Sequence, residues 1–179
     1  MLSSVELMRN GLTLIRATSS DAPYFYRHWN ESGWAIDMEK VREELDPKGE
    51  DAVFQYLIKI GEKVVGDVHH GRVDEGRAEI GVFIRDESQR RKGYGFLAIA
   101  IMIDHLFERG YERIIFNTAV DNAPMRHIAE KKLGLKPVIH EDVLQELSGR
   151  RESYAEYELA RCRDSPLINQ LFPRPVCRA

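Results

Sequence analysis

The stretch Gln89-Arg90-Arg91-Lys92-Gly93-Tyr94-Gly95 has the composition of an anion-binding turn. It follows an apolar, strand-like segment at residues 78–84 and opens a long, apolar, helix-like segment at residues 96–109. Glycines let the backbone approach a ligand closely, and the first N–H groups of a helix have no partner within that helix. Those donors, the positive end of the helix and the flanking basic side chains favour a phosphate or pyrophosphate at residues 90–96.

The spacing within this turn separates it from two common phosphate-binding motifs. A dinucleotide fold requires G-x-G-x-x-G and a P-loop requires G-x-x-x-x-G-K-[ST], and the turn matches neither pattern. The chain instead has R-x-x-G-x-G, formed by Arg90, Gly93 and Gly95. This pattern resembles the acetyl-CoA loop of the GNAT superfamily of N-acetyltransferases. Taken alone, the six residues would also fit an ordinary basic helix cap.

Two further segments strengthen the resemblance. Glu79 lies eleven residues before the first arginine of the loop, where the histone-acetyltransferase branch carries a general-base glutamate in a similar sequence. Downstream, a strand-like segment at residues 111–118 is followed by Asn122 and by a helix that closes on Lys132-Leu133-Gly134-Leu135, which looks like the second signature of the family. The resemblance covers about residues 11–160, and the chain is identified as a member of the superfamily.

Hydrophobic periodicity and turn residues predict the elements that position these residues. The expected elements are a strand at 12–16, helices at 19–30 and 38–45, strands at 53–60, 64–70 and 77–85, a helix at 93–109, a strand at 112–119, a helix at 123–133, and strands at 136–143 and 152–160. The resemblance implies the same order, β-α-α-β-β-β-α-β-α-β-β, in an α/β fold with a mixed sheet of the GNAT acyl-CoA N-acyltransferase type. In that fold the strands at 77–85 and 112–119 splay apart around the pantetheine of the cofactor.

The resemblance also implies which residues hold acetyl-CoA. Backbone groups of Phe83, Ile84 and Arg85 would lie along the pantetheine amides. The loop residues expected around the pyrophosphate are Arg90, Arg91, Lys92, Gly93, Tyr94, Gly95 and Phe96. Asn122 would hydrogen-bond the pantetheine arm, and Arg126 would reach a phosphate. The alternatives are a helix N-cap for Asn122 and a solvated helix residue for Arg126.

Acetyl transfer to an amine needs a base, because an amine is protonated near pH 7 and must lose its proton before attack. Glu79 is the expected catalytic base, and a paired surface carboxylate or a half-buried one is the alternative. The thioester oxygen gains negative charge during attack, and a backbone N–H beside the splayed strand would stabilise it.

The general acid is not readable from the sequence. Many family members have a tyrosine in the helix of the second motif, four residues before the closing glycine, and here that position is Glu130. Asn122 to Gly134 spans twelve residues, where the family usually has eleven, so either the helix is locally irregular or the asparagine is shifted by one. Tyr154 and Tyr157 are weaker substitutes, because their β-propensity alone explains them.

Three side chains are candidates for contact with the acceptor: Trp29, Trp34 and His69. The two tryptophans flank the break between the first two helices, a region that often shapes the acceptor pocket in this fold, and core packing is an equal alternative. His69 and His70 are adjacent in a strand, so their rings point to opposite faces and are poorly placed to share a metal ion. We predict no metal site.

Length and composition predict one domain, placed at residues 1–160, with a tail at 161–179 that contains Cys162 and Cys177. The net charge of −3 gives no general attraction to nucleic acid or to an anionic membrane. No apolar run reaches the roughly 18 residues of a membrane helix. An N-terminus without signal-peptide features and two cysteines without C-x-x-C spacing fit a cytoplasmic setting. A homodimer through the late strands or the tail is left open.

The sequence therefore predicts an acetyl-CoA-dependent N-acetyltransferase that acts by direct attack of a primary amine on the thioester. The acceptor is either a small amine or the N-terminus or a lysine of a protein. The alternative is a non-catalytic acyl-CoA-binding sensor or docking module, and a third interpretation is a phosphate-binding domain for another nucleotide.

Overall fold

The computed structural model describes residues 6–49, 52–144 and 151–161. The chain divides into a first unit, Met1–Arg72 with Gly81–Ile101, and a second unit, Val73–Ile80 with Met102–Ala179. The predicted tail lies outside the described residues, except for its first residue. Both cysteines belong to that part of the chain.

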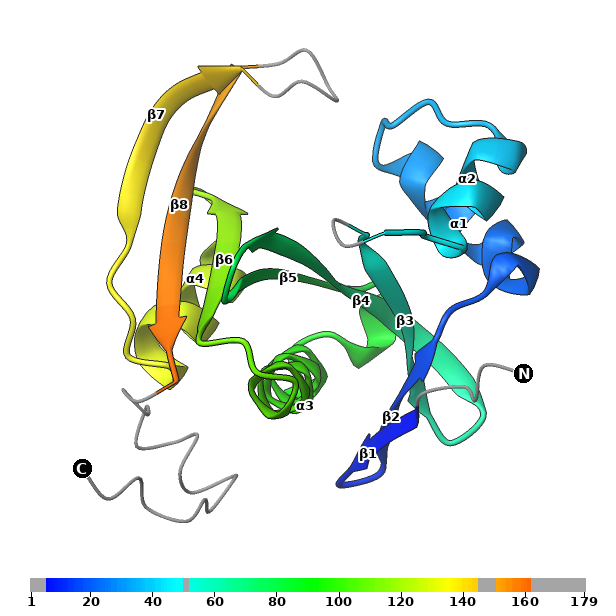
Figure 1. The fold of residues 1–179 in the computed structure, drawn as a ribbon, viewed down its shortest axis with the longest axis horizontal. Coiled ribbons are helices and arrows are strands. Elements are labelled where there is room, and N and C mark those ends of the chain that lie inside the picture. Colours follow the sequence, from blue (N-terminus) through cyan, green and yellow to red (C-terminus); the bar gives the residue numbers. More distant parts are fainter. Residues whose placement is uncertain (1–5, 50–51, 145–150, 162–179) are drawn as a thin grey trace. The chain divides into compact units, whose positions relative to one another are not determined.

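Eight described strands form one mixed sheet in the order β1-β2-β3-β4-β5-β6-β8-β7 (Figure 1). Their bounds are β1 (Glu6–Arg9), β2 (Leu12–Arg16), β3 (Phe54–Ile60), β4 (Lys63–Asp74), β5 (Arg77–Ile84), β6 (Arg113–Ala119), β7 (Val138–Leu144) and β8 (Arg151–Ala160). The predicted α/β fold with a mixed sheet is confirmed, and every predicted strand is present within a few residues of its expected bounds.

The helices also follow the predicted order. They are α1 (Ala22–Glu31), α2 (Met38–Leu45), α3 (Tyr94–Glu108) and α4 (Ala123–His127), with short 3-10 turns η1 (Ser19–Asp21) and η2 (Glu87–Gln89) and a π-helical turn η3 (Ile128–Lys132). None of the helices in the described segments is long and apolar enough to cross a membrane.

The strand β1 is the element that the sequence analysis missed. It pairs antiparallel with β2 through the two-residue turn Asn10-Gly11. The φ angles of this turn are +48° and +77°. Asn-Gly with positive φ at both positions is the preferred two-residue hairpin turn, because its twist matches that of the flanking strands. The dipeptide was therefore the signal that would have predicted this hairpin.

In the first unit, α1 and α2 pack together over one face of β3. Asp37 caps α2, its Oδ1 accepting a hydrogen bond from the N–H of Lys40 at 2.8 Å. Both helices bury one apolar stripe. The buried members of this core are Ala17, Ala22, Phe25, Trp29, Val41, Leu45 and Leu57. This core holds α1 and α2 together. The segment between these two helices was predicted to border the acceptor pocket.

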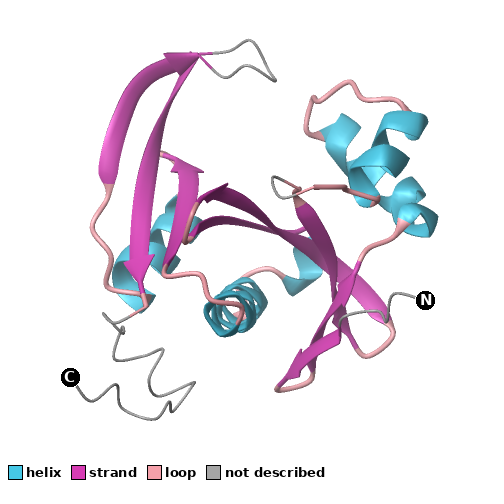
Figure 2. Ribbon diagram, in the orientation of Figure 1, coloured by secondary structure: helices cyan, strands magenta, loops and turns pink. Residues whose placement is uncertain are grey.

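In the second unit, the first residues of β5 pair parallel with β6, and β6 pairs antiparallel with β8. Figure 2 shows β8 continuing as a long antiparallel ribbon with β7. Alternate residues of β5 and of the later part of β8 are buried, as expected for a sheet with one covered face, whereas Ile114, Ile115 and Phe116 of β6 are all buried. The buried set includes Ala78, Ile80, Ile114, Phe116, Ala155, Tyr157 and Leu159. Glu79 projects from the opposite face.

The helix of the second motif contains the local irregularity that its length suggested. Regular α-helix ends at His127, and the next five residues form the π turn. The N–H of Leu133 donates to the carbonyl of Ile128, five residues back, at 2.9 Å. A π turn adds one residue to a helix without changing its ends, and such turns occur frequently at functional sites. It accounts for the extra residue between Asn122 and Gly134.

Gly66 of β4 is expected to tolerate no side chain. A Cβ at this position would lie 2.1 Å from the carbonyl oxygen of Phe83, which is backbone and cannot swing away. Gly66→Ala should therefore lower the free energy of unfolding by about 2–3 kcal/mol, the cost of an overpacked site. Thermal or urea unfolding measures this.

Gly71 of the same strand is the matched control, because its nearest neighbour is a side-chain atom of Val53 at 3.2 Å. Gly71→Ala should change stability by less than about 1 kcal/mol. Equal losses for the two variants would contradict the close approach of Gly66 to β5.

Candidate functional site

The anion loop (residues 90–96) connects β5 to α3 and lies in the first unit. Within it, Arg91 has φ +61° and Gly93 has φ +89°, both in the left-handed region. Glycine adopts this region freely, whereas arginine does so at a cost of about 1–3 kcal/mol, a strain that concentrates at ligand-binding turns. Turns of this kind aim successive N–H groups at one point and thereby suit an anion.

The start of α3 adds further donors. The N–H of Leu97 donates to the carbonyl of Gly93 at 3.0 Å, which is the first bond of the helix ladder. The N–H groups of Tyr94, Gly95 and Phe96 precede that bond, and so they are available to a ligand at the positive end of the helix dipole. The geometry suits the predicted phosphate contact, which stays a prediction.

Two basic side chains of the loop are engaged in holding its shape. Arg90 donates from Nε to the carbonyl of Ile84 and from Nη1 to the carboxylate of Glu87, both at 3.0 Å. Lys92 donates to the side-chain oxygen of Gln89 at 3.1 Å. These contacts brace the loop against the end of β5, so Arg90 has a structural role in addition to the predicted cofactor contact.

Asp86 closes the turn between β5 and the loop. Its Oδ1 accepts hydrogen bonds from the N–H and the hydroxyl of Ser88 at 2.9 and 2.6 Å. Its Oδ2 lies 2.5 Å from Nζ of Lys63. Lys63, followed by Ser88, lowers the pKa of Asp86 to about 2. The charged carboxylate is therefore the form that stabilises this turn.

The end of β5 presents only some of its backbone groups outward. The N–H groups of Arg85 and Asp86 donate to the carbonyl of Val65 on β4 at 3.0 and 3.1 Å. Because backbone groups alternate along a strand, Ile84 points its own N–H to the opposite edge. The ladder between β5 and β6 covers only Arg77–Glu79. Of the three residues predicted along the pantetheine, Ile84 is thus the one whose N–H points to the unpaired edge of β5. The N–H of Val82, which the prediction omitted, points to the same edge.

The acceptor candidates differ in exposure. Trp29 is 4% exposed within the core of the first unit, so its observed role is packing. Trp34 stacks on it with ring centroids 5.4 Å apart, yet remains 43% exposed. His69 is half-buried on β4 and stacks with Phe83 at 6.3 Å. Trp34 and His69 remain predicted acceptor contacts, because each presents surface to solvent.

In the second unit, Glu79 receives one hydrogen bond. The side-chain amide of Asn117 on β6 donates to its Oε1 at 3.2 Å. Ile115, the register partner of Glu79, lies two residues before Asn117, so these side chains share one face of the sheet. The carboxylate is half-buried rather than enclosed. A half-buried carboxylate held by one amide is compatible with a base that must also reach a substrate.

Asn122 fills the capping role that was its alternative. Its Oδ1 accepts from the N–H of Met125 at 3.3 Å, and its Nδ2 donates to the hydroxyl of Thr118 at 2.9 Å. The side chain therefore links the end of β6 to the first turn of α4. A bond to pantetheine remains a prediction and would share the residue with this cap.

Arg126 belongs to a network with Glu130 and Tyr157. Arg126 Nε and the hydroxyl of Tyr157 both donate to Oε1 of Glu130, at 2.9 and 2.8 Å. Arg126 also donates from Nη1 to the carbonyl of Val120 at 2.9 Å. Tyr157, followed by Arg126, lowers the pKa of Glu130. Burial, followed by the bond to Glu130, raises the pKa of Tyr157. Arg126 is therefore not simply solvated.

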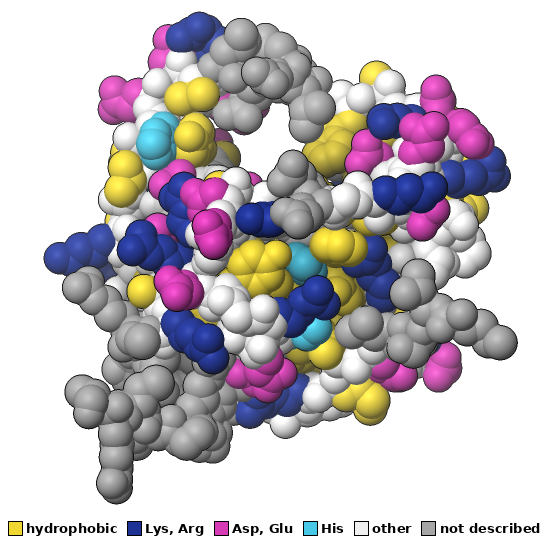
Figure 3. Space-filling model, viewed as in Figure 1, with side chains coloured by type: hydrophobic (Ala, Val, Ile, Leu, Met, Phe, Trp, Pro, Cys, Tyr) yellow, Lys and Arg dark blue, Asp and Glu magenta, His cyan; other side chains and the backbone are white. Residues whose placement is uncertain are grey.

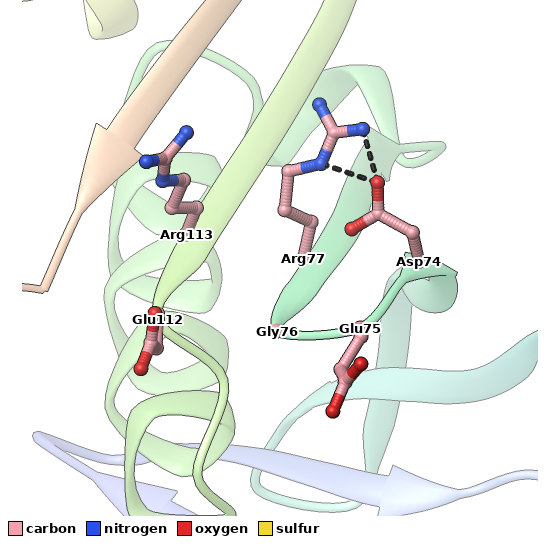
Figure 4. A pocket seen from close by; sticks show the side chains of 6 residues that line it. All are labelled: Asp74, Glu75, Gly76, Arg77, Glu112 and Arg113. Carbon is pink, nitrogen blue, oxygen red and sulfur yellow. Dashed lines mark hydrogen bonds and ion pairs between the residues drawn. The ribbon is translucent and has the colours of Figure 1, made fainter.

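The surface also has a cavity of about 360 Å³ in the second unit. On the face seen in Figure 3, acidic and basic side chains are interspersed. The cavity has the same mixed character, and its lining is Asp74, Glu75, Gly76, Arg77, Glu112 and Arg113. Figure 4 shows the two arginines directed to one side and the two glutamates to the other, with Arg77 bonded to Asp74. None of the predicted site residues lines this cavity.

Comparison with known proteins gives the class. The family model described as "Acetyltransferase (GNAT) domain" matches residues 11–136. The chain belongs to the GNAT acetyltransferase family, as predicted, and is thereby placed among the N-acetyltransferases. A comparison with curated proteins finds no match.

Several solved structures share the fold. The ribosomal L7/L12 alpha-N-protein acetyltransferase RimL in complex with coenzyme A is 18% identical, with a TM-score of 0.72 over 87% of this chain and 98% of that one. The Salmonella typhimurium enzyme that modifies the N-terminal serine of the same ribosomal protein is 18% identical, with a TM-score of 0.69 and coverage of 85% and 96%. The microcin C7 self-immunity acetyltransferase MccE, in complex with acetyl-CoA and AMP, is 17% identical, with a TM-score of 0.67 and coverage of 85% and 93%.

Sequence reasoning missed the polar contacts that hold the predicted residues. Asp67 bonds the side chain of Arg85, Asn117 bonds Glu79, and Tyr157 bonds Glu130. Each pair joins positions 18 or more residues apart, so no local spacing could have suggested it. The one available signal was chemical, since a charged residue with apolar neighbours, such as Asp67 in the segment Val64-Val65-Gly66-Asp67-Val68, requires a partner when that segment is buried.

Asp86 generates a pH prediction. Its pKa is lower in the folded chain than the ordinary value near 4, so its contribution to stability is present above about pH 4 and is lost as the pH falls toward 2. Asp86→Asn should lower the melting temperature at pH 6 and flatten its dependence on pH between 4 and 2. Asp121→Asn, at an exposed loop position, serves as the control. An unchanged pH profile in Asp86→Asn would contradict the assigned role.

Proposed function

We propose that this protein transfers the acetyl group of acetyl-CoA to a primary amine by direct attack of the amine on the thioester. The observation that carries the proposal is the anion loop, where Arg91 and Gly93 in left-handed conformations lead into the N-terminus of α3. Family membership supports the same class of reaction. The bound donor supplies a thioester carbonyl that is open to attack.

The residues proposed to hold the donor lie in the anion loop, at the edge of β5 and at the start of α4. In the first unit, the N–H groups from Arg91 to Phe96 would take the pyrophosphate, and Ile84 would pair with the pantetheine. In the second unit, Asn122 and Arg126 are the proposed contacts. Arg126 already bonds Glu130, so a phosphate would have to share its guanidinium with that carboxylate.

Glu79 is the proposed general base. It would accept the proton that the acceptor ammonium loses, and the neutral nitrogen then forms its bond to the carbonyl carbon. The C–S bond breaks to release the thiolate, and the second proton of the nitrogen passes to water. Asn117, by donating to one carboxylate oxygen, leaves the other for the amine or for a bridging water. A backbone N–H at the outer edge of β5 would stabilise the developing oxyanion.

A separate general acid is not part of this proposal. The hydroxyl of Tyr157 donates to Glu130, and its raised pKa makes it a weak acid. Glu130 has a lowered pKa and stays ionised near neutral pH. The sulfur is therefore proposed to leave as the thiolate.

For the acceptor we propose the α-amine of a peptide or protein. The solved structures with this fold include an alpha-N-protein acetyltransferase of ribosomal L7/L12 and an enzyme that modifies the N-terminal serine of that ribosomal protein. A hexapeptide amide that begins with serine is thus the first probe, and spermidine represents the small amines. If the acetyl group is transferred to spermidine and not to the peptide, the acceptor class is a polyamine and not a peptide.

Gly93→Ala tests the loop. A Cβ at φ +89° costs about 1 kcal/mol of strain and stands on the surface that the pyrophosphate would approach. At a hundred times its dissociation constant, acetyl-CoA should add about 2.7 kcal/mol to wild-type stability in thermal unfolding. In Gly93→Ala we expect its affinity to fall about tenfold or more, for the loss of one close backbone contact.

Gly110 is the matched control, because it has φ +97° at the end of α3 and open space around it, as Gly93 does. Gly110→Ala should lose similar stability and keep its affinity for acetyl-CoA. If acetyl-CoA and CoA stabilise neither the wild type nor Gly110→Ala, the loop does not bind the donor. Stabilisation by ATP in their place would favour another nucleotide.

Glu79→Gln tests the chemistry. The substitution keeps an oxygen for Asn117 but removes the basic carboxylate, so turnover measured by thiol release should fall about 10²–10⁴-fold. Donor affinity and melting temperature should stay near those of wild type. Glu112→Gln, also exposed in the second unit, is the control and should keep full turnover. Unchanged turnover in Glu79→Gln would exclude this base, and a wild type that binds acetyl-CoA without turnover would favour a sensor.

A further inference from the structure

The first unit contains a buried carboxylate that the proposed reaction does not use. Asp67 of β4 is only 1% exposed. Its Oδ1 accepts from Arg85 Nε at 2.8 Å and from the hydroxyl of Tyr24 at 3.2 Å, and its Oδ2 accepts from Arg85 Nη2 at 3.3 Å. Burial, followed by the Asp67 carboxylate, raises the pKa of Tyr24, so this hydroxyl keeps its proton and donates. Asp67 thereby ties α1 to the end of β5.

Arg85 carries this arrangement to an exposed ring. Its guanidinium carbon lies 4.4 Å from the ring centre of Phe83, which is in the range of a cation–π contact. Its Nη1 donates to the hydroxyl of Ser32, directly after α1, at 3.3 Å. Phe83 itself remains 43% exposed. A single exposed aromatic side chain is common on a protein surface, but the ring of Phe83 is also held in place by the guanidinium of Arg85.

His69 completes the same face. Its ring is stacked with Phe83 at an interplanar angle of 25°. It lies flat over residue 81, where a Cβ would come within 2.2 Å of the imidazole. A glycine at position 81 is therefore what leaves room for the ring. We call Phe83, His69 and Arg85 together the Phe83 platform.

The ion pair between Asp67 and Arg85 is not explained by a contribution to the stability of the fold. Replacing a buried ion pair by apolar residues of similar volume is often neutral or stabilising, since desolvation offsets the attraction between the charges. What Asp67 does provide is orientation, because a two-point carboxylate contact fixes the plane of a guanidinium. That plane lies against Phe83, so the carboxylate governs where the ring sits.

The platform lies beside the strand that is proposed to carry the donor. Phe83 on β5 and Arg85, directly after the strand, lie on one face, whereas Val82 and Ile84 project to the other, since side chains alternate along extended chain. The donor is assigned to the backbone edge of this strand, which leaves the face with His69 and the end of α1 to the second substrate. An exposed aromatic ring on that face suits an apolar group close to the reacting amine.

We propose that the Phe83 ring contacts an apolar side chain that the acceptor peptide carries at its second position, one residue after the reacting amine, and that Asp67 and Arg85 are positioning residues that hold this ring. This inference rests on the proposed acetyl transfer and adds a specificity element to it. It assigns the side chains of Phe83 and Arg85 to the acceptor, separately from the backbone groups assigned to the donor.

The test uses two hexapeptide amides, Ser-Ile and Ser-Gly at their first two positions and otherwise identical, with the full-length chain. We expect wild type to prefer the Ser-Ile peptide, and Phe83→Ala to raise its KM about tenfold, the value of burying one side chain. The KM for acetyl-CoA should change less than about threefold, since the backbone is kept. Tyr26→Ala, an exposed aromatic of α1, is the matched control and should leave both constants unchanged.

A double-mutant cycle separates positioning from general stability. Asp67→Asn should raise the KM of the Ser-Ile peptide as Phe83→Ala does, and should add less than about threefold in the Phe83→Ala background. If Asp67→Asn does not fold, Arg85→Lys serves in its place, because lysine keeps the charge and loses the planar stack. If the two substitutions raise the KM of the Ser-Ile peptide independently, so that their effects multiply in the double variant, the positioning role of Asp67 is overturned.

The outcomes distinguish this inference from the proposed function. If wild type acetylates neither peptide nor spermidine, the proposed function fails and the inference fails with it. If wild type acetylates an amine but Phe83→Ala behaves as Tyr26→Ala does, only the inference is overturned. Loss of the Ser-Ile preference in Phe83→Ala, with an unchanged KM for acetyl-CoA, supports it.

Discussion

The hydrogen bonds from the N–H groups of Arg85 and Asp86 to the carbonyl of Val65 set the point at which β5 ends. Everything after that point depends on them, because the chain turns there into the anion loop and then into α3. The contact of Gly66 with the Phe83 carbonyl lets β4 approach closely enough to make these bonds. Asp86 and Arg90 then close the turn from the other side. Backbone N–H groups that bind an anion need such contacts, because the N–H groups keep fixed directions only if the conformation of the loop is fixed.

The second unit meets a different constraint. One residue more than the usual number lies between the cap at Asn122 and the closing Gly134, and a π turn takes it up without displacing either end. Within that turn Glu130 accepts hydrogen bonds from Arg126 and Tyr157. The position that commonly carries a tyrosine hydroxyl in the family thus holds an ionised carboxylate, while a hydroxyl reaches the same place from β8. Because neither the ionised Glu130 nor the Tyr157 hydroxyl is a ready proton donor, the proposed reaction has the sulfur leave as the thiolate.

Much of the architecture followed from local patterns. The α2 helix has a capping aspartate and apolar residues at helical spacing, and its predicted bounds agree with those in the structure. The strand β1 was missed although Asn10-Gly11 marks its hairpin, because only four residues precede that turn within the strand. The anion loop was recognisable because a helix N-terminus and its glycines act through the backbone, which adjacent residues in the sequence determine.

The sequence by itself determined the family, the order of the elements, the loop and the candidate base. The tertiary structure decided which side chains support them. Asp67 meets Arg85 and Glu79 meets Asn117 only after strands distant in the chain have paired, and Glu130 meets Tyr157 only after the π turn has packed against β8. Hydrophobic spacing records which face of an element is buried, but it does not record which polar group on another element that face will meet. Long-range pairing and packing set those contacts, because strand register and the docking of a helix on a sheet bring together residues between which local spacing carries no information.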